Sequence, residues 1–154
     1  MTLQDCIHFQ LTTAQHAVFR YFGGLLSDYG VTPGQYGVLA CLWDYGSLSP
    51  GQIGDLMCLE PSSVSTVLDR MQKNGLLERT IHPDNHRAIQ VTLTDRGRAL
   101  EEPMRGIARQ VNQQVLEPFT LEEREITARV LLSMVRRDFE AEGGAFRQGK
   151  HSTQ

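Results

Sequence analysis

One stretch of sequence decides the fold, EPSSVSTVLDRMQKNGLLER at residues 60–79. A proline at its start, small hydroxyl side chains in its first turns, cations in its last turn and a glycine after them are typical of a single α-helix. Its apolar residues recur at helical spacing and predict one buried stripe: Val64, Val67, Leu68 and Met71. The opposite face of this helix then presents hydroxyl groups to the solvent.

Two short strands are predicted directly after this helix, between residues 76 and 94. Ile89, Val91 and Leu93 alternate with polar residues, which indicates a half-buried strand, and residues 76–81 supply its partner. The segment PDNHR at 83–87 separates the strands with a polar tip that carries an arginine. A helix followed by two strands and such a tip is typical of a winged helix-turn-helix module. The helix of that module enters a DNA major groove, and an arginine of the wing reaches the adjacent minor groove.

Start signals predict further helices on both sides of this module. TPGQ at 32–35 and SPGQ at 49–52 each combine a hydroxyl cap, a proline at the first helical position and a glutamine that completes a capping box. The second of these helices is short, with Ile53, Leu56 and Met57 expected to face inward. A first helix is expected over residues 4–28 and a long one after residue 95, where Pro103 and Gly106 predict a bend or interruption. TLEE at 120–123 is a capping box for a last helix.

The predicted fold is mainly α with a small β-wing, a winged helix-turn-helix core flanked by N- and C-terminal dimerisation helices. We expect residues 32–98 to form the DNA-binding lobe and residues 4–28 with 99–141 to form the helical dimerisation region. The Gly-rich residues 142–154 are expected to be a flexible tail. The first helix and the last two carry more apolar residues than three helices alone can bury, which favours a homodimer.

Composition narrows the function classes. The chain of 154 residues has a net charge of −3, yet residues 62–98 carry six Lys or Arg against four Asp or Glu. Phosphate binding depends on such a local patch rather than on the total charge. No apolar run is long enough to cross a bilayer, and no signal-peptide layout is present at the N-terminus, so we expect a cytoplasmic protein without a membrane partner. Cys6, Cys41 and Cys58 are odd in number and favour free thiols, with the last two buried as small hydrophobic residues.

Several short motifs occur together and in order. These are LDRM at 68–71, GLL at 75–77 followed by Arg79, Asp84 and Arg87 in the wing, and LTDRG at 93–97. In this arrangement the chain resembles the MarR family of bacterial transcriptional regulators over nearly its whole length. The resemblance implies a homodimer, a palindromic operator in double-stranded DNA, and control by a small ligand or an oxidant.

Two sets of residues are expected at the DNA. The first is expected to contact bases or phosphates and consists of Ser62, Ser63, Ser65, Thr66, Arg70, Lys73 and Arg87. The second is expected to brace the wing, as the resemblance implies for Asp69, and consists of Asp69, Arg79 and Asp84. Other interpretations stay open, since serine is common at helix N-termini and the cations also fit a solvated helix end and turn.

An effector site is predicted along the first helix. His8, Thr12, His16 and Arg20 recur every four residues, beside aromatic rings, and such a stripe suits an aromatic carboxylate. The full predicted set is His8, Phe9, Thr12, His16, Phe19, Arg20 and Phe22 on the first helix with Tyr36 on the second. The simpler interpretation, polar residues at a surface or interface, explains the same stripe.

Three other functions each find some support among the residues. A redox-sensing repressor would use Cys6, but the resemblance to the hydroperoxide-sensing branch places His8, not a cysteine, at the reactive position. A metal sensor would use Cys6, His8 and His16, or His82 and His86. A small Cys/His enzyme is the third alternative, but the sequence lacks the nucleophile turn and the paired carboxylates that such an enzyme would use. We therefore expect a ligand-responsive DNA-binding regulator that acts as a repressor. We expect no catalytic residues, no metal and no cofactor.

Overall fold

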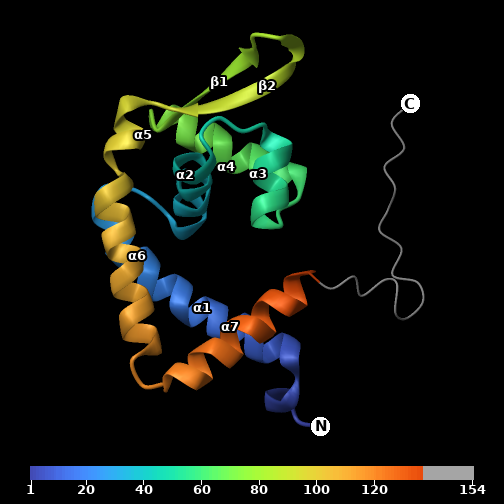
Figure 1. Cartoon of the computed structure of the whole chain (residues 1–154), viewed down its shortest axis with the longest axis vertical. Helices are drawn as coiled ribbons and strands as arrows, with labels where there is room; N and C mark the ends of the chain where they lie inside the picture. The colour runs from blue at the N-terminus through green and yellow to red at the C-terminus, as the bar shows by residue number, and fades with distance from the viewer. Residues whose placement is uncertain (137–154) are drawn as a thin grey trace, which may run out of the picture. The chain divides into compact units, whose positions relative to one another are not determined.

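The computed structural model describes residues 1–136, apart from the side chains of His86 and Arg87. It divides into two compact units, Met1–Val115 and Leu116–Gln154. In chain order the elements are η1 (Leu3–Asp5), α1 (Ile7–Leu26), η2 (Ser27–Tyr29), α2 (Pro33–Tyr45), α3 (Pro50–Met57), α4 (Pro61–Lys73), β1 (Leu77–His82), β2 (Asn85–Leu93), α5 (Asp95–Ala99), α6 (Glu101–Leu116) and α7 (Leu121–Arg136) (Figure 1). The predicted fold class, mainly α with a two-stranded wing, is confirmed.

Both capping boxes of the lobe form as predicted. Thr32 Oγ1 accepts a hydrogen bond from the backbone of Gln35 at 3.2 Å, and Gln35 Oε1 accepts one from the backbone of Thr32 at 3.1 Å. Ser49 and Gln52 repeat the arrangement at 3.1 and 2.9 Å. These reciprocal bonds satisfy N–H groups that have no partner inside the helix, so they fix where α2 and α3 begin. The first helix begins later than expected, at Ile7, because residues 3–5 form a separate 3-10 turn.

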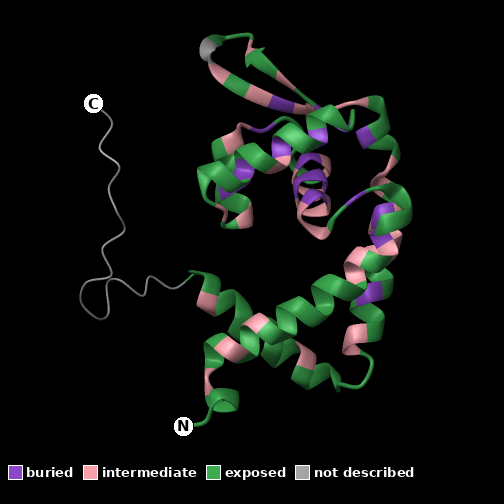
Figure 2. Ribbon diagram, turned by 180° about the vertical axis from the view of Figure 1, so that it is seen from behind, coloured by how far each residue is buried: buried purple, intermediate pink, exposed green. Residues whose placement is uncertain are grey.

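The hydrophobic core lies in the lobe of α2, α3 and α4 and at the base of the wing (Figure 2). Buried stripes from the helices meet there with Leu76, Leu77 and Val91. The expectation for α3 was wrong at Leu56, which is 46% exposed. Ile53 is buried as predicted, and Gly54 is buried beside it; an added Cβ on Gly54 would lie 3.1 Å from the carbonyl oxygen of Leu59. That close approach is why the turn between α3 and α4 is tight.

The wing is an antiparallel hairpin whose register pairs Arg79 with Val91 and Ile81 with Ile89. Its turn is shorter than expected, because β2 already begins at Asn85 and Arg87 therefore lies within the strand rather than in a loop. The backbone of Val91 also exchanges two hydrogen bonds with Leu48, at 2.7 and 3.2 Å. This bridge attaches the wing to the loop between α2 and α3.

The long helix expected after residue 95 is interrupted at Leu100, as the proline predicted. Pro103 lacks the N–H that would bond to the carbonyl oxygen of Ala99, and its ring crowds that carbonyl. α5 consequently ends at Ala99, and α6 begins at Glu101.

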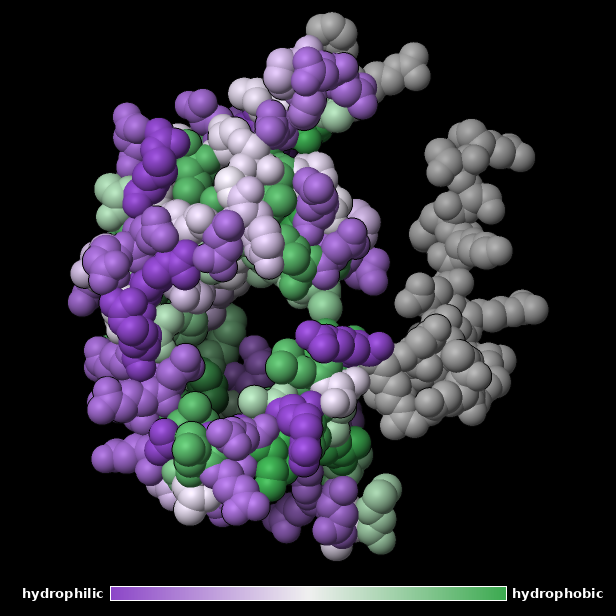
Figure 3. Space-filling model, viewed as in Figure 1, coloured by the Kyte–Doolittle hydropathy of each residue, from purple (hydrophilic) through white to green (hydrophobic). Residues whose placement is uncertain are grey.

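The second unit contributes α7, which begins at the predicted capping box. Thr120 Oγ1 accepts from the backbone of Glu123, and the Glu123 carboxylate accepts from the backbone of Thr120, at 3.2 and 2.8 Å. Large apolar side chains of α7 are exposed at the surface (Figure 3): Leu121, Ile126, Val130, Leu131, Leu132 and Val135. Residues 137–141 of the predicted dimerisation region and the predicted tail, 142–154, lie outside the described residues.

Candidate nucleic-acid interface

The first turns of α4 form a polar face made of hydroxyl groups. Ser62, Ser63, Ser65 and Thr66 are all exposed, whereas Val64 on the same helix is buried. Thr66 Oγ1 donates to the carbonyl oxygen of Ser62 at 2.9 Å, so its hydroxyl group remains available as an acceptor. Side chains this short allow a helix to approach the floor of a DNA groove closely.

The other end of α4 is cationic and is attached to the wing. Arg70 and Lys73 are exposed in the last turn. Arg79, on β1, donates from Nη2 to Asp69 Oδ1 at 2.5 Å and from Nε to Gln72 Oε1 at 2.7 Å. The guanidinium group therefore joins the first strand of the wing to the last turns of α4, so that the hairpin and the helix keep a fixed relation.

The tip of the wing lies between His82 and Asn85. The backbone N–H of Asp84 donates to His82 Nδ1 at 3.1 Å, which orients the turn. A wing-bracing bond from Asp84 to Arg87 would involve a side chain outside the described residues, and the bonds of Arg79 go to α4 rather than to Asp84. Arg87 itself stands in β2, three residues after Asp84.

A groove of about 510 Å³ runs between α3, α4 and the wing. Ser65, Arg79 and Ile89 line it together with apolar residues of both helices. Sequence analysis placed Ile89 in a half-buried strand, but it is 49% exposed because the hairpin extends beyond the lobe at this point. In the sequence, Ile89 lies close to the tip of the hairpin and not at its base. That position was the signal that its side chain would be exposed.

The predicted effector residues fall into two groups. His16, Phe19 and Arg20 line an open hollow of about 550 Å³ along α1, together with Thr13. Phe22 instead contacts Tyr36 of α2, with ring centroids 5.0 Å apart in an edge-on arrangement. His8 is exposed, and Phe9 and Thr12 are half-buried nearer the N-terminus of α1.

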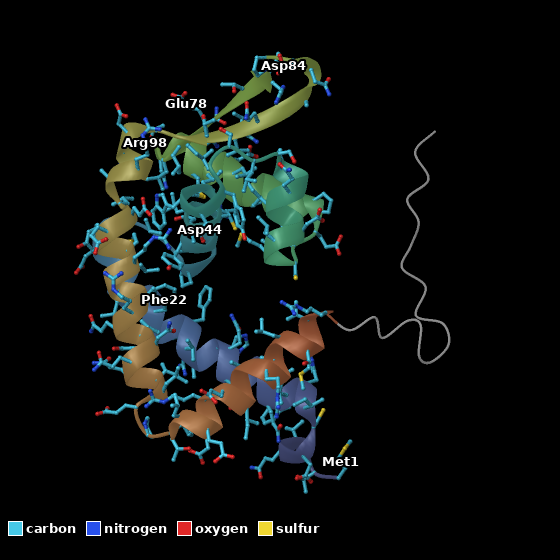
Figure 4. All side chains as sticks on the ribbon, viewed as in Figure 1. Met1, Phe22, Asp44, Glu78, Asp84 and Arg98 are labelled. Carbon is cyan, nitrogen blue, oxygen red and sulfur yellow. The ribbon has the colours of Figure 1, made fainter. Side chains whose placement is uncertain are left out.

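A cluster continues from Tyr36 through Trp43, which the sequence also offered as a wall of the effector site, to Arg105, Asp44 and Glu101, which it did not. The Tyr36 and Trp43 rings are 6.1 Å apart, and the guanidinium carbon of Arg105 lies 5.5 Å from the centre of the Trp43 ring. Arg105 Nη2 donates to Asp44 Oδ1 at 2.7 Å, and Arg105 Nε donates to Glu101 Oε1 at 3.0 Å. We refer to Phe22, Tyr36, Trp43, Asp44, Glu101 and Arg105 as the Arg105 cluster; Figure 4 labels its members Phe22 on α1 and Asp44 on α2.

Electrostatics in this cluster follow from its packing. Burial raises the pKa of the Tyr36 hydroxyl, and the hydrogen bond from Arg105 to Asp44 raises the pKa of the guanidinium group. Burial also raises the pKa of the Cys41 thiol on the same helix as Tyr36. The cluster thus combines a fixed cation with neutral aromatic walls, the groups that bind an aromatic carboxylate.

Comparison with known proteins agrees with this geometry. The model of the MarR family matches residues 31–89. The HTH-type transcriptional regulator TtmR of Methylorubrum extorquens is 30% identical over 133 residues, which cover 86% of this chain and 67% of TtmR. The chain belongs to the MarR family. It is therefore a transcriptional regulator at the level of the family, and its relatives are regulators rather than enzymes.

Solved structures of MarR-type regulators share the fold. A probable transcriptional regulator from Pseudomonas aeruginosa is 33% identical, with a TM-score of 0.73 over 87% of this chain and 99% of that one. BpsR of Bordetella bronchiseptica is 27% identical, with a TM-score of 0.83 over 90% of this chain and 99% of BpsR. The BpsR structure was described for the regulation of its DNA binding by 6-hydroxynicotinic acid.

The cysteines of this MarR chain differ in exposure. Cys6 is half-buried, and Cys58 is exposed, which corrects the expectation that it is buried. Cys58 ends α3 in a left-handed conformation, with φ 53°, in the turn before α4. Among residues 1–136, leaving aside the side chain of His86, no three His, Cys, Asp or Glu side chains are placed to hold a metal ion. No helix in the same part of the chain is long and apolar enough to span a bilayer.

Proposed function

We propose that this MarR-family chain is a homodimeric repressor that binds a palindromic operator and is released by a small aromatic acid. Each protomer inserts α4 into a major groove and its wing into the flanking minor groove. The observation that carries the proposal is the exposed hydroxyl face of α4 next to a wing that Arg79 joins to the same helix. We propose that it acts in the cytoplasm.

Within this interface, residues divide by role. The hydroxyls at the start of α4 contact base edges and phosphates, Arg70 and Lys73 contact phosphates, and Arg87 enters the minor groove. Asp69 and Arg79 hold the wing in register with α4. The two-fold axis of a dimer sets the two recognition helices roughly 10 base pairs apart.

The apolar surface supports a dimer. Ile7, Leu11, Val18 and Phe19 on α1 are exposed in the single chain, as are the six apolar side chains of α7 named above. So many exposed large apolar side chains on two helices favour an interface, because each of them contributes about 1.5–3 kcal/mol when it is buried. We infer that a second copy of this chain covers both helices.

An aromatic acid is the effector class that the side chains favour. Aromatic rings stand beside cations at two places, in the hollow of Phe19 and Arg20 and in the Arg105 cluster. The regulation of BpsR by 6-hydroxynicotinic acid supports the same class. A ligand that binds better to a dimer with misspaced recognition helices shifts the population away from the DNA-bound state.

The test is fluorescence anisotropy of labelled DNA from the region upstream of the gene for this protein, at controlled salt. We expect specific binding that one member of a panel of benzoates, hydroxynicotinates and hydroxycinnamates releases. The variant Arg87→Ala should bind at least about tenfold more weakly while remaining a folded dimer. Binding that is indifferent to every acid but lost on mild oxidation, and retained by Cys6→Ser, would replace the effector proposal with the redox alternative.

A further inference from the structure

Arg105 is a cation on which two carboxylates and an aromatic ring converge. Glu101 stands one turn earlier on the same helix, whereas Asp44 comes from α2, 61 residues away in the sequence. The ion pair with Asp44 therefore joins α6 to the DNA-binding lobe. Trp43, the neighbour of Asp44 on α2, supplies the ring under the guanidinium group.

The Arg105 cluster already pairs a carboxylate with a guanidinium group beside aromatic rings, as a bound aromatic acid would. A guanidinium group presents N–H donors that match carboxylates, and in the chain itself the Asp44 carboxylate takes Nη2 of Arg105 while Glu101 takes Nε. The rings of Trp43, Tyr36 and Phe22 form a continuous wall beside it. The side chain of Asp44 is 53% exposed and that of Arg105 is 29% exposed, so an external carboxylate can reach the guanidinium group from solvent. An ion pair this exposed contributes little stability, so its partner is exchangeable.

We propose that the carboxylate of the effector displaces Asp44 from Arg105, and that this exchange is the step that weakens DNA binding. The inference rests on the proposed function, in which an aromatic acid releases the operator. It assigns the carboxylate to Arg105, a residue outside the stripe on α1, and it gives Asp44 the role of an internal competitor.

Trp43 links the exchange at Arg105 to the recognition helix α4. Its Nε1 donates to the carbonyl oxygen of Gly97 at 3.1 Å. The segment around Gly97 is fastened to the end of α4, since Arg96 Nη1 donates to the carbonyl oxygen of Asn74 at 2.8 Å and Thr94 Oγ1 donates to that of Gly75 at 2.6 Å. A ring that packs on Trp43 and a carboxylate that removes Asp44 therefore act on groups linked to the last turn of α4.

The experiment uses Trp43 as its own probe, because it is the single tryptophan of the chain. Tryptophan fluorescence of the full-length protein is titrated with 6-hydroxynicotinate, benzoate and 4-hydroxycinnamate, with nicotinamide as a neutral analogue. We expect a saturable change with at least one acid and none with nicotinamide. The variant Arg105→Gln should bind that acid at least about tenfold more weakly.

The variant Asp44→Asn carries the sharper prediction. Because this variant removes the internal competitor, its affinity for the acid should rise about threefold to tenfold. Its operator affinity should fall by a similar factor before any acid is added. A merely structural role for Asp44 would weaken both kinds of binding. The matched control is Arg109→Gln on the same helix, whose guanidinium group pairs with Glu102 at 2.8 Å and is 64% exposed; it should behave as the wild type.

The outcomes separate this inference from the proposed function. If an acid releases DNA but binds both variants with wild-type affinity, the exchange is wrong and the proposed function stands. If no acid in the panel changes either fluorescence or DNA binding, both are wrong. Circular dichroism checks the fold of each variant, and Arg105→Lys, which keeps the charge but loses the parallel donors, replaces Arg105→Gln if the latter does not fold.

Discussion

The indole Nε1 of Trp43 donates a hydrogen bond to the carbonyl oxygen of Gly97 across 54 residues of sequence. Gly97 is buried at the start of α5, and a Cβ added to it would lie 2.1 Å from the carbonyl oxygen of Leu76. Leu76 comes directly between α4 and β1. One short contact chain therefore connects α2, α5 and the junction of the recognition helix with the wing, so changes at any of these points should affect DNA binding.

The variant Gly97→Ala tests how closely this junction is packed. The new Cβ cannot be accommodated against a backbone carbonyl, so we expect a loss of about 3 kcal/mol or more in the free energy of unfolding. Urea denaturation followed by circular dichroism measures it. The control Gly34→Ala lies in the first turn of α2, where nothing stands within 4 Å of an added Cβ. It should be neutral or stabilising by up to about 1 kcal/mol.

Local and distant features differ in how well the sequence predicted them. The capping boxes at Thr32, Ser49 and Thr120 involve residues three apart, so pattern alone located the starts of α2, α3 and α7. The ion pair between Asp44 and Arg105 joins residues 61 positions apart, and no local spacing predicts it. The same limit explains the error at Leu56, because the inward face of α3 depends on how closely Gly54 approaches the next turn.

Arg79 and Lys73 should weaken DNA binding in different ways. Arg79→Ala removes the bonds to Asp69 and Gln72, so the wing loses its fixed position and affinity should fall about tenfold, with the salt dependence of binding retained. Lys73→Ala removes an exposed cation from the last turn of α4, so log–log plots of affinity against salt should lose about one unit of slope. Anisotropy titrations at several salt concentrations measure both. Equal slopes for the two variants would contradict the division between bracing and phosphate contact.

Alkali should reveal the environment of Tyr36. Burial raises its pKa above the ordinary value of 10.0, so the folded chain holds this proton more tightly than the unfolded chain does. The stabilisation is fully present below pH 10.0 and is lost as the pH rises through the higher folded pKa. The variant Tyr36→Phe should therefore lose less stability than the wild type above pH 10.0, measured by denaturation across that range. Tyr45→Phe, at an exposed position, is the control, and an identical change there would contradict the assignment.

The thiols should differ in their rates of alkylation. Cys58 is exposed in the turn before α4, whereas Cys41 is half-buried and its pKa is raised by burial and by the nearby charge of Asp44. Because the thiolate is the reactive form, Cys41 should react with iodoacetamide at least about tenfold more slowly than Cys58 in the folded chain. Peptide mapping by mass spectrometry measures both rates, and in denaturant the difference should disappear. Comparable rates in the folded chain would mean that α2 opens readily.

The dimer proposal makes a prediction for α7. Leu131 is 44% exposed in the single chain, and burial of a charge at this position in a dimer would cost several kcal/mol without a partner. Leu131→Glu should therefore yield a monomer in sedimentation experiments at micromolar concentration, with its helical content unchanged. Operator affinity should fall with it, because one α4 then binds one half-site alone. Arg129→Glu introduces the same side chain at an exposed polar position of the same helix and should remain a dimer. A dimeric Leu131→Glu protein would exclude this part of α7 from the interface.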